Sequence, residues 1–359
     1  MLNWLLEKFG IGFNDGALFV VAAIVSFFIM ILFGNKFIVA MRRWQKKGQP
    51  ISENLPTSHL EKRGTPTVGG LMLLIAAMVS AFLFMDFSAP ANWIAIGALM
   101  WFGWIGFADD YKKIKKQSNK AANGLSPRFR LIAEGIGIII IAYFINMLMP
   151  FYIPSYSVAL PGGYIIPIGI LYFAFAYFVI AGSANAVNIS DGLDGLSSKL
   201  YLPVLIVLFI GLLGATHTEF LTNALLIPNA AGLYPVLGAV FGAVVGFLWF
   251  NAAPAQIFMG DTGSLALGGF MGTIAMLLKI EVLMGIAALM MVLILLSSFI
   301  QTFVYKLTKN PNGIGKRVFL RAPLHHHFEE KGIPETKITD RFFIMAMLFS
   351  GLALILMGI

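Results

Sequence analysis

The stretch from Asn92 to Lys113 reads NWIAIGALMWFGWIGFADDYKK. Its first part, up to Ala108, is almost entirely apolar, and the residues that follow include two aspartates and two lysines. An apolar segment of roughly 17 to 25 residues can cross the hydrocarbon core of a bilayer as a helix. Acidic residues held against such a segment are costly and usually mark a functional site. The stretch therefore predicts a membrane helix with chemistry at one end.

The whole chain shares this character. Of its 359 residues, 58% are hydrophobic and only 12% are charged, whereas soluble domains are about 25% charged. This predicts an all-α, polytopic integral membrane protein with a single domain over residues 1–359. Ten spans are expected, near residues 17–40, 68–86, 92–108, 131–149, 165–182, 200–216, 232–250, 264–279, 282–304 and 342–358.

Charge and cysteine content narrow the function classes. The net charge of +8 belongs to loops between apolar segments, so it does not indicate a nucleic-acid partner. The chain has no cysteine, which excludes disulfides, thiolate metal sites and a cysteine nucleophile.

Lysine and arginine set the expected orientation. Of the 25 basic residues, 22 lie in the loops 41–67, 109–130 and 305–341 or at Lys199, all on one face of the predicted membrane domain. The positive-inside rule makes that face cytoplasmic and puts both termini in the periplasm. The segments that contain aspartate, asparagine and histidine side chains fall in the same loops, so we expect an active site facing the cytoplasm.

Asp109 and Asp110 end the third predicted span. Adjacent carboxylates repel each other, so a cation or nearby lysines such as Lys113 would stabilise the pair. The alternative is a solvated, charged helix end. Lysines at this depth also suit the phosphate group of a membrane lipid.

A second polar segment, NISDGLDG from Asn188 to Gly195, contains Asp191 and Asp194. Its glycines indicate a sharp turn whose backbone a ligand can approach. A calcium loop needs a D-x-D-x-D spacing that is missing here. A turn with capping aspartates is one reading, and Mg²⁺ with phosphate oxygens is favoured because Mg²⁺ takes one or two carboxylates.

Asp261 lies in FMGDTGS, directly before the eighth predicted span, with Asn251 in the same loop. An N-cap is the plain explanation for an aspartate at this place. A metal ligand beside a helix N-terminus, where anions are favoured, fits as well.

His325, His326 and His327 follow a proline near the C-terminal end of the cytoplasmic loops. Three consecutive histidines cannot all face one zinc from a helix. With Arg321 upstream, they are expected to donate hydrogen bonds to a polyanionic substrate. Lys62 and Thr65 would add further donors, although a flexible loop is the default there.

In their order and spacing, these segments resemble the prokaryotic polyprenyl-phosphate N-acetylhexosamine-1-phosphate transferase superfamily. Within it they are similar to the phospho-N-acetylmuramoyl-pentapeptide transferase family. The resemblance covers nearly the whole chain and rests on KRGTPTVGG from Lys62, the Asp109–Asp110 pair, NAVN from Asn185, FMGDTGSLALGG from Phe258 and APLHHHFE from Ala322.

The resemblance implies a reaction at the cytoplasmic face of the bacterial plasma membrane. Undecaprenyl phosphate attacks the β-phosphate of UDP-MurNAc-pentapeptide, with Mg²⁺, and gives lipid I and UMP, the first membrane step of peptidoglycan synthesis. By position, Asp261 matches the Mg²⁺ ligand, and Asp109 and Asp110 match the pair that binds or deprotonates the lipid phosphate. A homodimer is a family expectation. The expected substrate contacts are Lys62, Thr65, Lys113, Arg130, Asn188, Asp191, Asp194, Asn251, His325, His326 and His327.

Three departures from the family pattern stand out. Arg130 replaces a common lysine, Ile294 stands where the family often has a glutamate while Gln301 is retained, and the loop 305–316 is longer than usual.

Two alternative functions stay open: a sister transferase that uses a GlcNAc donor, and an ion-coupled secondary transporter. Transporter acids usually lie near mid-membrane in repeated, broken helices, whereas these lie at one face.

Overall fold

The structure is a computed structural model that describes residues 14–45, 64–115, 124–150, 152–217, 230–311 and 313–358. These residues form helices, with one small antiparallel hairpin of β1 (Ser157–Leu160) and β2 (Tyr164–Pro167). Eight helices are long and apolar enough to cross a membrane. They are α2 (Asp15–Gln45), α4 (Pro90–Lys115), α5 (Pro127–Leu148), α6 (Leu171–Ser190), α7 (Leu196–Thr216), α8 (Leu233–Asn251) with the 3₁₀ turn η2 (Ala230–Gly232) before it, α11 (Leu289–Leu307) and α13 (Glu335–Met357).

Four shorter helices complete the chain: α3 (Gly69–Phe84), α9 (Gly260–Leu277), α10 (Glu281–Ala287) and α12 (Leu324–Glu330). The prediction of a polytopic, all-helical membrane protein is confirmed at this level, and the expected number of ten spans stays a prediction. Two expected spans differ in detail. Residues 165–167 belong to β2, so that span begins only at Leu171, and the span expected at 282–304 is interrupted at Ala288, between α10 and α11.

The hairpin was not expected because the stretches of sequence that form its two strands are short. Its strands pair Leu160 with Tyr164, and the turn between them contains Gly162 and Gly163, both with positive φ, 88° and 78°. Glycine adopts this backbone conformation at no steric cost. A four-residue strand inside a long apolar run cannot be told from a helix by periodicity.

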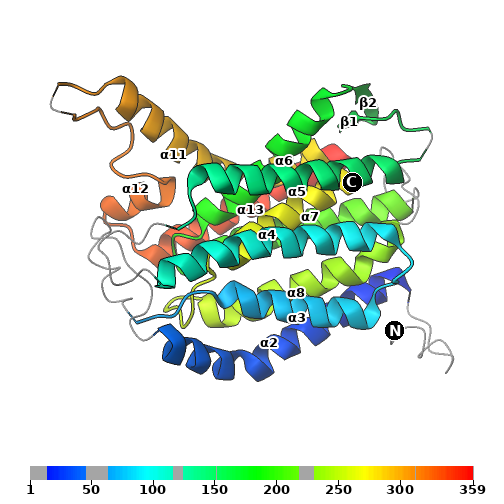
Figure 1. The fold of residues 1–359 in the computed structure, drawn as a ribbon, viewed down its shortest axis with the longest axis horizontal. Helices are drawn as coiled ribbons and strands as arrows, with labels where there is room; N and C mark the ends of the chain where they lie inside the picture. The colour runs from blue at the N-terminus through cyan, green and yellow to red at the C-terminus, as the bar shows by residue number, and fades with distance from the viewer. Residues whose placement is uncertain are drawn as a thin grey trace.

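Helix α9 lies inside the bundle, between α4 and α6 (Figure 1). Every residue from Thr262 to Leu277 is buried, as expected for a helix that is apolar all round. The beginning of α9 meets the ends of α4 and α6, and this arrangement sets the site described below.

Small residues allow the helices to pack closely. A Cβ atom added at Gly238 or Gly242 of α8 would lie only 2.1 Å or 1.9 Å from the backbone oxygens of Phe19 or Ala23 in α2. Close van der Waals packing through small residues is a main source of helix association in lipid. The glycines of α8 therefore hold α2 against the bundle.

Helix α11 leans away from the other helices at the upper left of Figure 1. Phe299, Phe303 and Leu307 on it are 62%, 65% and 70% exposed. Apolar side chains that stand free of the bundle are suited to a hydrocarbon surrounding. By contrast, Ile294 near its beginning is fully buried.

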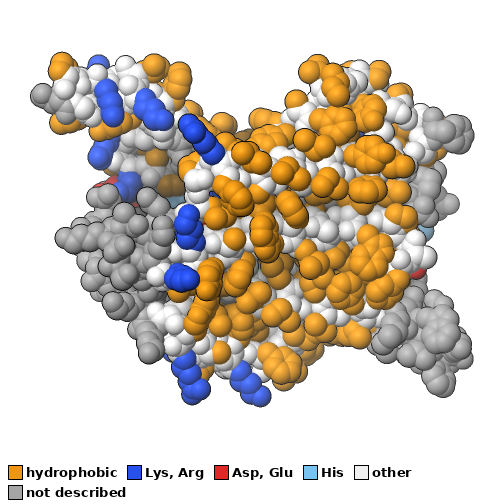
Figure 2. All heavy atoms as spheres, viewed as in Figure 1, with side chains coloured by type: hydrophobic (Ala, Val, Ile, Leu, Met, Phe, Trp, Pro, Cys, Tyr) orange, Lys and Arg blue, Asp and Glu red, His pale blue; other side chains and the backbone are white. Residues whose placement is uncertain are grey.

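The two ends of the bundle differ in charge. Lys and Arg side chains gather at the end where α4 finishes and α12 lies, and the flank between the ends is mostly apolar (Figure 2). The β1–β2 hairpin, the beginning of α2 and the end of α13 lie at the opposite end (Figure 1). This polarity agrees with the orientation expected from the sequence, and the sidedness itself stays a prediction.

Candidate functional site

The end of α4 carries Asp109 and Asp110, which are only 5% and 3% exposed. The helix continues past them to Lys115, so Lys113 lies one turn after Asp109 on the same face. The Nζ atom of Lys113 lies 2.7 Å from Oδ2 of Asp109. The predicted pairing of lysine with this carboxylate is therefore present.

Asp261, in the first turn of α9, joins the same cluster. Lys113 Nζ lies 3.0 Å from Asp261 Oδ2, so one ammonium group bridges the carboxylates of Asp109 and Asp261. From α6, Asn188 Nδ2 donates to Asp261 Oδ1 at 2.9 Å and to Ser264 Oγ at 2.8 Å. The site is thus built from three segments that are more than seventy positions apart in the sequence.

Arg130, in the first turn of α5, adds a second positive charge. Its NH1 atom lies 3.9 Å from Asp261 Oδ2. Its Nε atom lies 2.9 Å from the buried Glu134, and its NH2 atom donates to Asn185 Oδ1 at 2.8 Å. Because the planar guanidinium group binds several acceptors at once, Arg130 is held in one orientation beside Asp261.

Asp110 points at the backbone of α9. Its Oδ1 accepts from the N–H of Asp261 at 3.1 Å, and its Oδ2 accepts from the N–H and the hydroxyl of Thr262 at 2.9 Å and 2.6 Å. The neighbouring aspartates of α4 therefore have different surroundings, which the sequence did not distinguish.

Two glycines allow α9 to approach so closely. A Cβ atom at Gly106 of α4 would lie 2.1 Å from the backbone oxygen of Asp261, and one at Gly70 of α3 would lie 2.1 Å from the backbone nitrogen of Gly263. No side chain fits in either place. Sequence reasoning missed Gly106, although it precedes the Asp pair by a single helical turn.

Asp191 directly follows α6 next to this cluster; part of the residue is exposed, and its carboxyl group is buried. Burial raises the pKa of its carboxyl well above the usual range, and the nearby charge of Asp261 adds to the rise, while a hydrogen bond from the Gly260 backbone offsets part of it. A carboxyl group whose pKa is shifted by burial and by a neighbouring charge is a candidate functional position.

Asp194 and Asn251 tie loops together. Asp194 Oδ2 accepts from the N–H of Ala255 at 2.9 Å, and its own N–H donates to Glu335 at 2.6 Å. Asn251 accepts from the N–H of Gly195 at 3.1 Å and donates to the backbone oxygen of Ile257 at 2.9 Å. Sequence reasoning missed Glu335, since no local pattern marks it.

The three histidines have three different surroundings. His325 is fully buried, and a Cβ atom at Gly192 would lie 2.2 Å from its Nε2 atom, so it packs on the turn that carries Asp191. His326 pairs with Glu329 in its own helix. His327 Nδ1 accepts from the N–H of Leu320 at 3.1 Å. His325 therefore contacts the Asp191 turn.

The segment with Thr65 reaches the cluster through its backbone. The oxygen of Pro66 accepts from the N–H of Phe258 at 2.9 Å, and the oxygen of Phe258 accepts from the N–H of Gly69 at 2.8 Å. Thr65 itself is half-buried beside this connection. Lys62 lies outside the residues that the structure describes.

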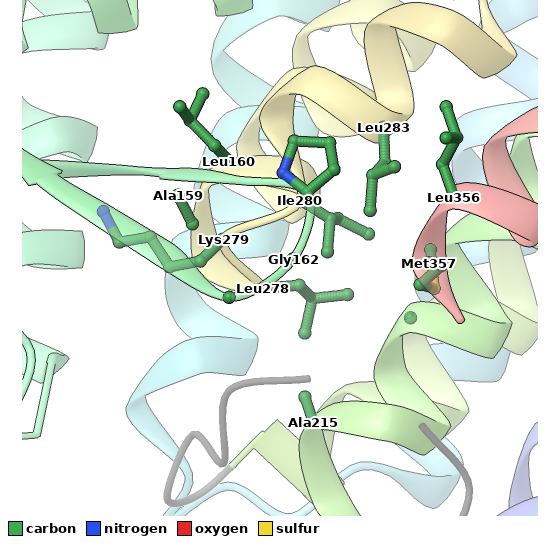
Figure 3. Close-up of a pocket in the computed structure, with 13 residues that line it drawn as sticks. Ala159, Leu160, Gly162, Ala215, Leu278, Lys279, Ile280, Leu283, Leu356 and Met357 are labelled. Carbon is green, nitrogen blue, oxygen red and sulfur yellow. The ribbon is translucent and has the colours of Figure 1, made fainter. Parts of the chain in front are cut away.

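A pocket at the other end of the bundle is unrelated to this cluster. It lies between the β1–β2 hairpin, the α9–α10 junction and the end of α13 (Figure 3). Its lining is largely apolar, with Leu160, Ile280, Leu283 and Met357 among the lining residues. Asp261 is at the beginning of α9 and the pocket is at its end, roughly 25 Å away at 1.5 Å per residue.

The cluster at the beginning of α9 fits a divalent cation. The carboxylates of Asp109 and Asp261 already share a positively charged group, Lys113 Nζ, at 2.7 Å and 3.0 Å. Mg²⁺ is usually held by one or two carboxylates and completes its shell with water and phosphate oxygens. Within the described ranges, no group of three or more His, Cys, Asp or Glu side chains is arranged as a metal site, so an all-protein cage of the zinc type is not seen there.

About half of the chain matches the model of a known protein family. The model of glycosyl transferase family 4 matches residues 92–279, which include α4 with its Asp pair, the Asp191 turn and Asp261. The chain belongs to glycosyl transferase family 4. The matched range contains the acid cluster of Asp109, Asp110 and Asp261 together with Lys113 and Asn188.

A curated relative extends the likeness beyond the matched range. The phospho-N-acetylmuramoyl-pentapeptide-transferase of Desulfotalea psychrophila is 41% identical to this family 4 chain over 337 residues. The alignment covers 91% of this chain and 89% of the relative. The chain is therefore a transferase whose likeness to that enzyme runs through nearly all of its helices.

Proposed function

We propose that the chain transfers phospho-MurNAc-pentapeptide from UDP-MurNAc-pentapeptide to undecaprenyl phosphate, giving lipid I and UMP. The observation that carries the proposal is the 41% identity to an enzyme named for this transfer, over 91% of the chain. The cluster of Asp109, Lys113 and Asp261 supports it, because phosphoryl transfer requires mainly positioning and neutralisation of charge.

Mg²⁺ is the proposed cofactor, and Asp261 is its proposed ligand with Asp109 beside it. When bound, Mg²⁺ supplies charge neutralisation at phosphate oxygens. Lys113 and Arg130 place two further positive charges beside Asp261. Charge-assisted hydrogen bonds from such groups bind phosphate strongly, so these two side chains are the proposed anchors of the diphosphate.

The lipid phosphate is the proposed nucleophile. A phosphate monoester has a second pKa of about 6, so it is largely dianionic at neutral pH and needs positioning more than deprotonation. One of its oxygens forms a bond to the β-phosphorus of the donor, the bond from that phosphorus to the bridging oxygen breaks, and UMP leaves. A phosphorylated aspartate is the competing route, and trapping it without lipid acceptor would overturn direct attack.

The nucleotide-sugar side is proposed to lie at the turn after α6. Asp191 ends that helix, and His325 packs on Gly192 directly after it. Asn188 links this turn to Asp261 through a hydrogen bond of 2.9 Å. A donor that reaches from the turn to the metal would therefore place its diphosphate beside Lys113. Asp194, Asn251, His326, His327, Thr65 and Lys62 remain proposed contacts from the family resemblance.

The proposed setting is the plasma membrane of a bacterium, with the acid cluster at the cytoplasmic face. The gathering of Lys and Arg at that end of the bundle (Figure 2) supports this orientation through the positive-inside rule. A homodimer is proposed on the resemblance alone.

One experiment separates the candidate functions. Release of UMP is measured in detergent with undecaprenyl phosphate and Mg²⁺, with either UDP-MurNAc-pentapeptide or UDP-GlcNAc as donor. Release with the first donor alone is expected. Release with UDP-GlcNAc alone would instead assign a sister transferase. Uptake of a solute by liposomes that contain the chain, without UMP release from either donor, would assign a transporter.

A further inference from the structure

Helix α9 begins without a cap of its own. The residue before it, Met259, makes no side-chain hydrogen bond to the helix. The first N–H groups of any helix lack partners within the helix and need acceptors from elsewhere. In α9, two of these groups belong to Asp261 and Thr262, and their acceptors come from another helix.

Asp110 of α4 supplies them. Its two carboxylate oxygens receive three hydrogen bonds, from the N–H of Asp261 at 3.1 Å and from the N–H and hydroxyl of Thr262 at 2.9 Å and 2.6 Å. The side chain is 3% exposed. Gly260 leaves the space for it, because a Cβ atom there would lie 2.6 Å from Asp110 Oδ2.

The neighbouring Asp109 lies differently. Its Oδ1 accepts from the N–H of Leu125 at 2.6 Å, and its Oδ2 contacts Lys113 Nζ, which also contacts Asp261, so one of its two oxygens faces the charged groups of the site. A general base has to reach the proton that it removes. Both oxygens of Asp110 are instead engaged by donors at the beginning of α9.

We infer that Asp110 is a positioning residue that caps α9 across the helix interface and holds the Asp261 carboxylate at Lys113 and Asn188, and that it exchanges no proton with substrate. The inference deepens the proposed function and depends on it only for the activity assay. It gives the Asp pair two jobs: Asp109 faces the reactants, and Asp110 fixes the helix that carries the proposed metal ligand.

Thr262→Val tests the cap without altering charge, since it removes one of the three donors to Asp110. Asp110→Asn removes the charge and leaves a single acceptor oxygen, because the NH₂ group of asparagine only donates, so the bonds at one of the two carboxylate positions are lost. The control is Thr273→Val, which removes a buried hydroxyl that donates to Gly269 at 2.8 Å further along the same helix. The unfolding temperature of each variant is measured to check that the variant folds.

The first readout is hydrogen exchange of the α9 amides in the full chain in detergent, without substrate or metal. A hydrogen bond to a charged group contributes about 1.5–3 kcal/mol, so its loss should speed local opening at least about tenfold. We expect faster exchange at Asp261 and Thr262 in both Asp110→Asn and Thr262→Val, and unchanged exchange there in Thr273→Val. Unchanged exchange at both amides in Asp110→Asn would overturn the cap, whatever reaction the chain catalyses.

The second readout is the pH profile of kcat for UMP release. A positioning role predicts that Asp110→Asn and Thr262→Val both lower kcat and leave the midpoints of the profile in place. Loss of the acidic limb in Asp110→Asn alone would identify Asp110 as a base and overturn the inference. If the wild-type chain releases no UMP, the proposed function fails, and the exchange experiment still decides on the cap.

Discussion

At the scale of single residues, Asp261 is the centre of the site because it contacts side chains from three other helices. Lys113 comes from α4, Arg130 from α5 and Asn188 from α6. These residues could be identified from the sequence as candidates for the site, since each lies in a polar segment between apolar ones. Their mutual distances could not, because local pattern says nothing about which loops meet.

Replacing Asp261 by asparagine is expected to lower turnover by more than about 100-fold at ordinary Mg²⁺ concentration, since it removes the proposed carboxylate ligand of Mg²⁺ and with it the charge neutralisation that the metal would supply at the phosphate oxygens. The measurement is kcat for UMP release over a range of Mg²⁺ concentrations. Asp340→Asn is the control, because it removes the exposed Asp340 carboxylate that pairs with Lys199 at 2.5 Å. Near-normal turnover of Asp261→Asn would refute the metal assignment.

Asp191 predicts a pH dependence of stability. Its pKa is raised, mainly by burial, so the folded chain carries a cost that grows as pH rises from the usual value of about 3.9 through the raised value. Asp191→Asn removes that cost. The gain in unfolding temperature, measured in detergent without substrate or metal, is therefore expected to be larger at pH 8 than at pH 4.5.

Asp86 provides a control of opposite sign. Hydrogen bonds from the Ser88 hydroxyl and backbone lower the pKa of its carboxyl. A lowered pKa contributes stability above the usual value that is lost only as pH falls through the lowered one. Asp86→Asn is therefore expected to reduce the unfolding temperature at both pH 4.5 and pH 8.

The outcome for Asp191→Asn decides the assigned cause. If this variant raised the unfolding temperature equally at both pH values, burial of the Asp191 carboxylate would be contradicted as the cause.

At the scale of the elements, the contact between α4 and α9 determines where the site lies. The long apolar segments were predicted correctly as helices because length and composition alone decide that a segment can cross a bilayer. The closeness of the two helices depends on Gly106, whose missing side chain makes room for the Asp261 backbone. A glycine in an apolar run looks the same whether it faces lipid or another helix, so this contact was not foreseen.

Gly106→Ala should displace the first turn of α9, because the added methyl group would lie 2.1 Å from the backbone oxygen of Asp261. Overpacking of this kind costs about 1–3 kcal/mol, and we expect at least a tenfold loss of kcat, about the lower end of that range. The matched control is Gly97→Ala in the same helix, where the added group meets no atom within 4 Å. Equal activity of the two variants would show that the close contact does not position Asp261.

At the scale of the whole molecule, the two ends of the bundle carry different chemistry. The site, α12 and the gathered Lys and Arg side chains seen in Figure 2 share one end, while the β1–β2 hairpin, Lys279 and the end of α13 share the other (Figures 1 and 2). Because helices alternate in direction, every second loop reaches the same end. This alternation is why the charged loops could be grouped from the sequence before any contact was known.

The absence of cysteine makes this sidedness testable with single cysteines. Lys316→Cys marks the basic end, and Tyr164→Cys marks the hairpin, where Tyr164 is 71% exposed. In intact cells, a membrane-impermeant maleimide is expected to label Tyr164→Cys and spare Lys316→Cys, and inside-out vesicles should reverse the result. The cysteine-free chain controls for background. Labelling of Lys316→Cys in intact cells would place the site outside.

The membrane setting, the helical class and the polar segments that supply the site could be predicted without coordinates, because hydrophobicity and charge act through composition and order along the chain. The different contacts of Asp109, Asp110 and Asp261 became visible with the packed helices. Asp109 shares the Lys113 ammonium with Asp261, and Asp110 binds the backbone of α9. The physical reason is that hydrogen bonds and ion pairs depend on distances of about 3 Å, and helix packing sets those distances between residues far apart in the chain.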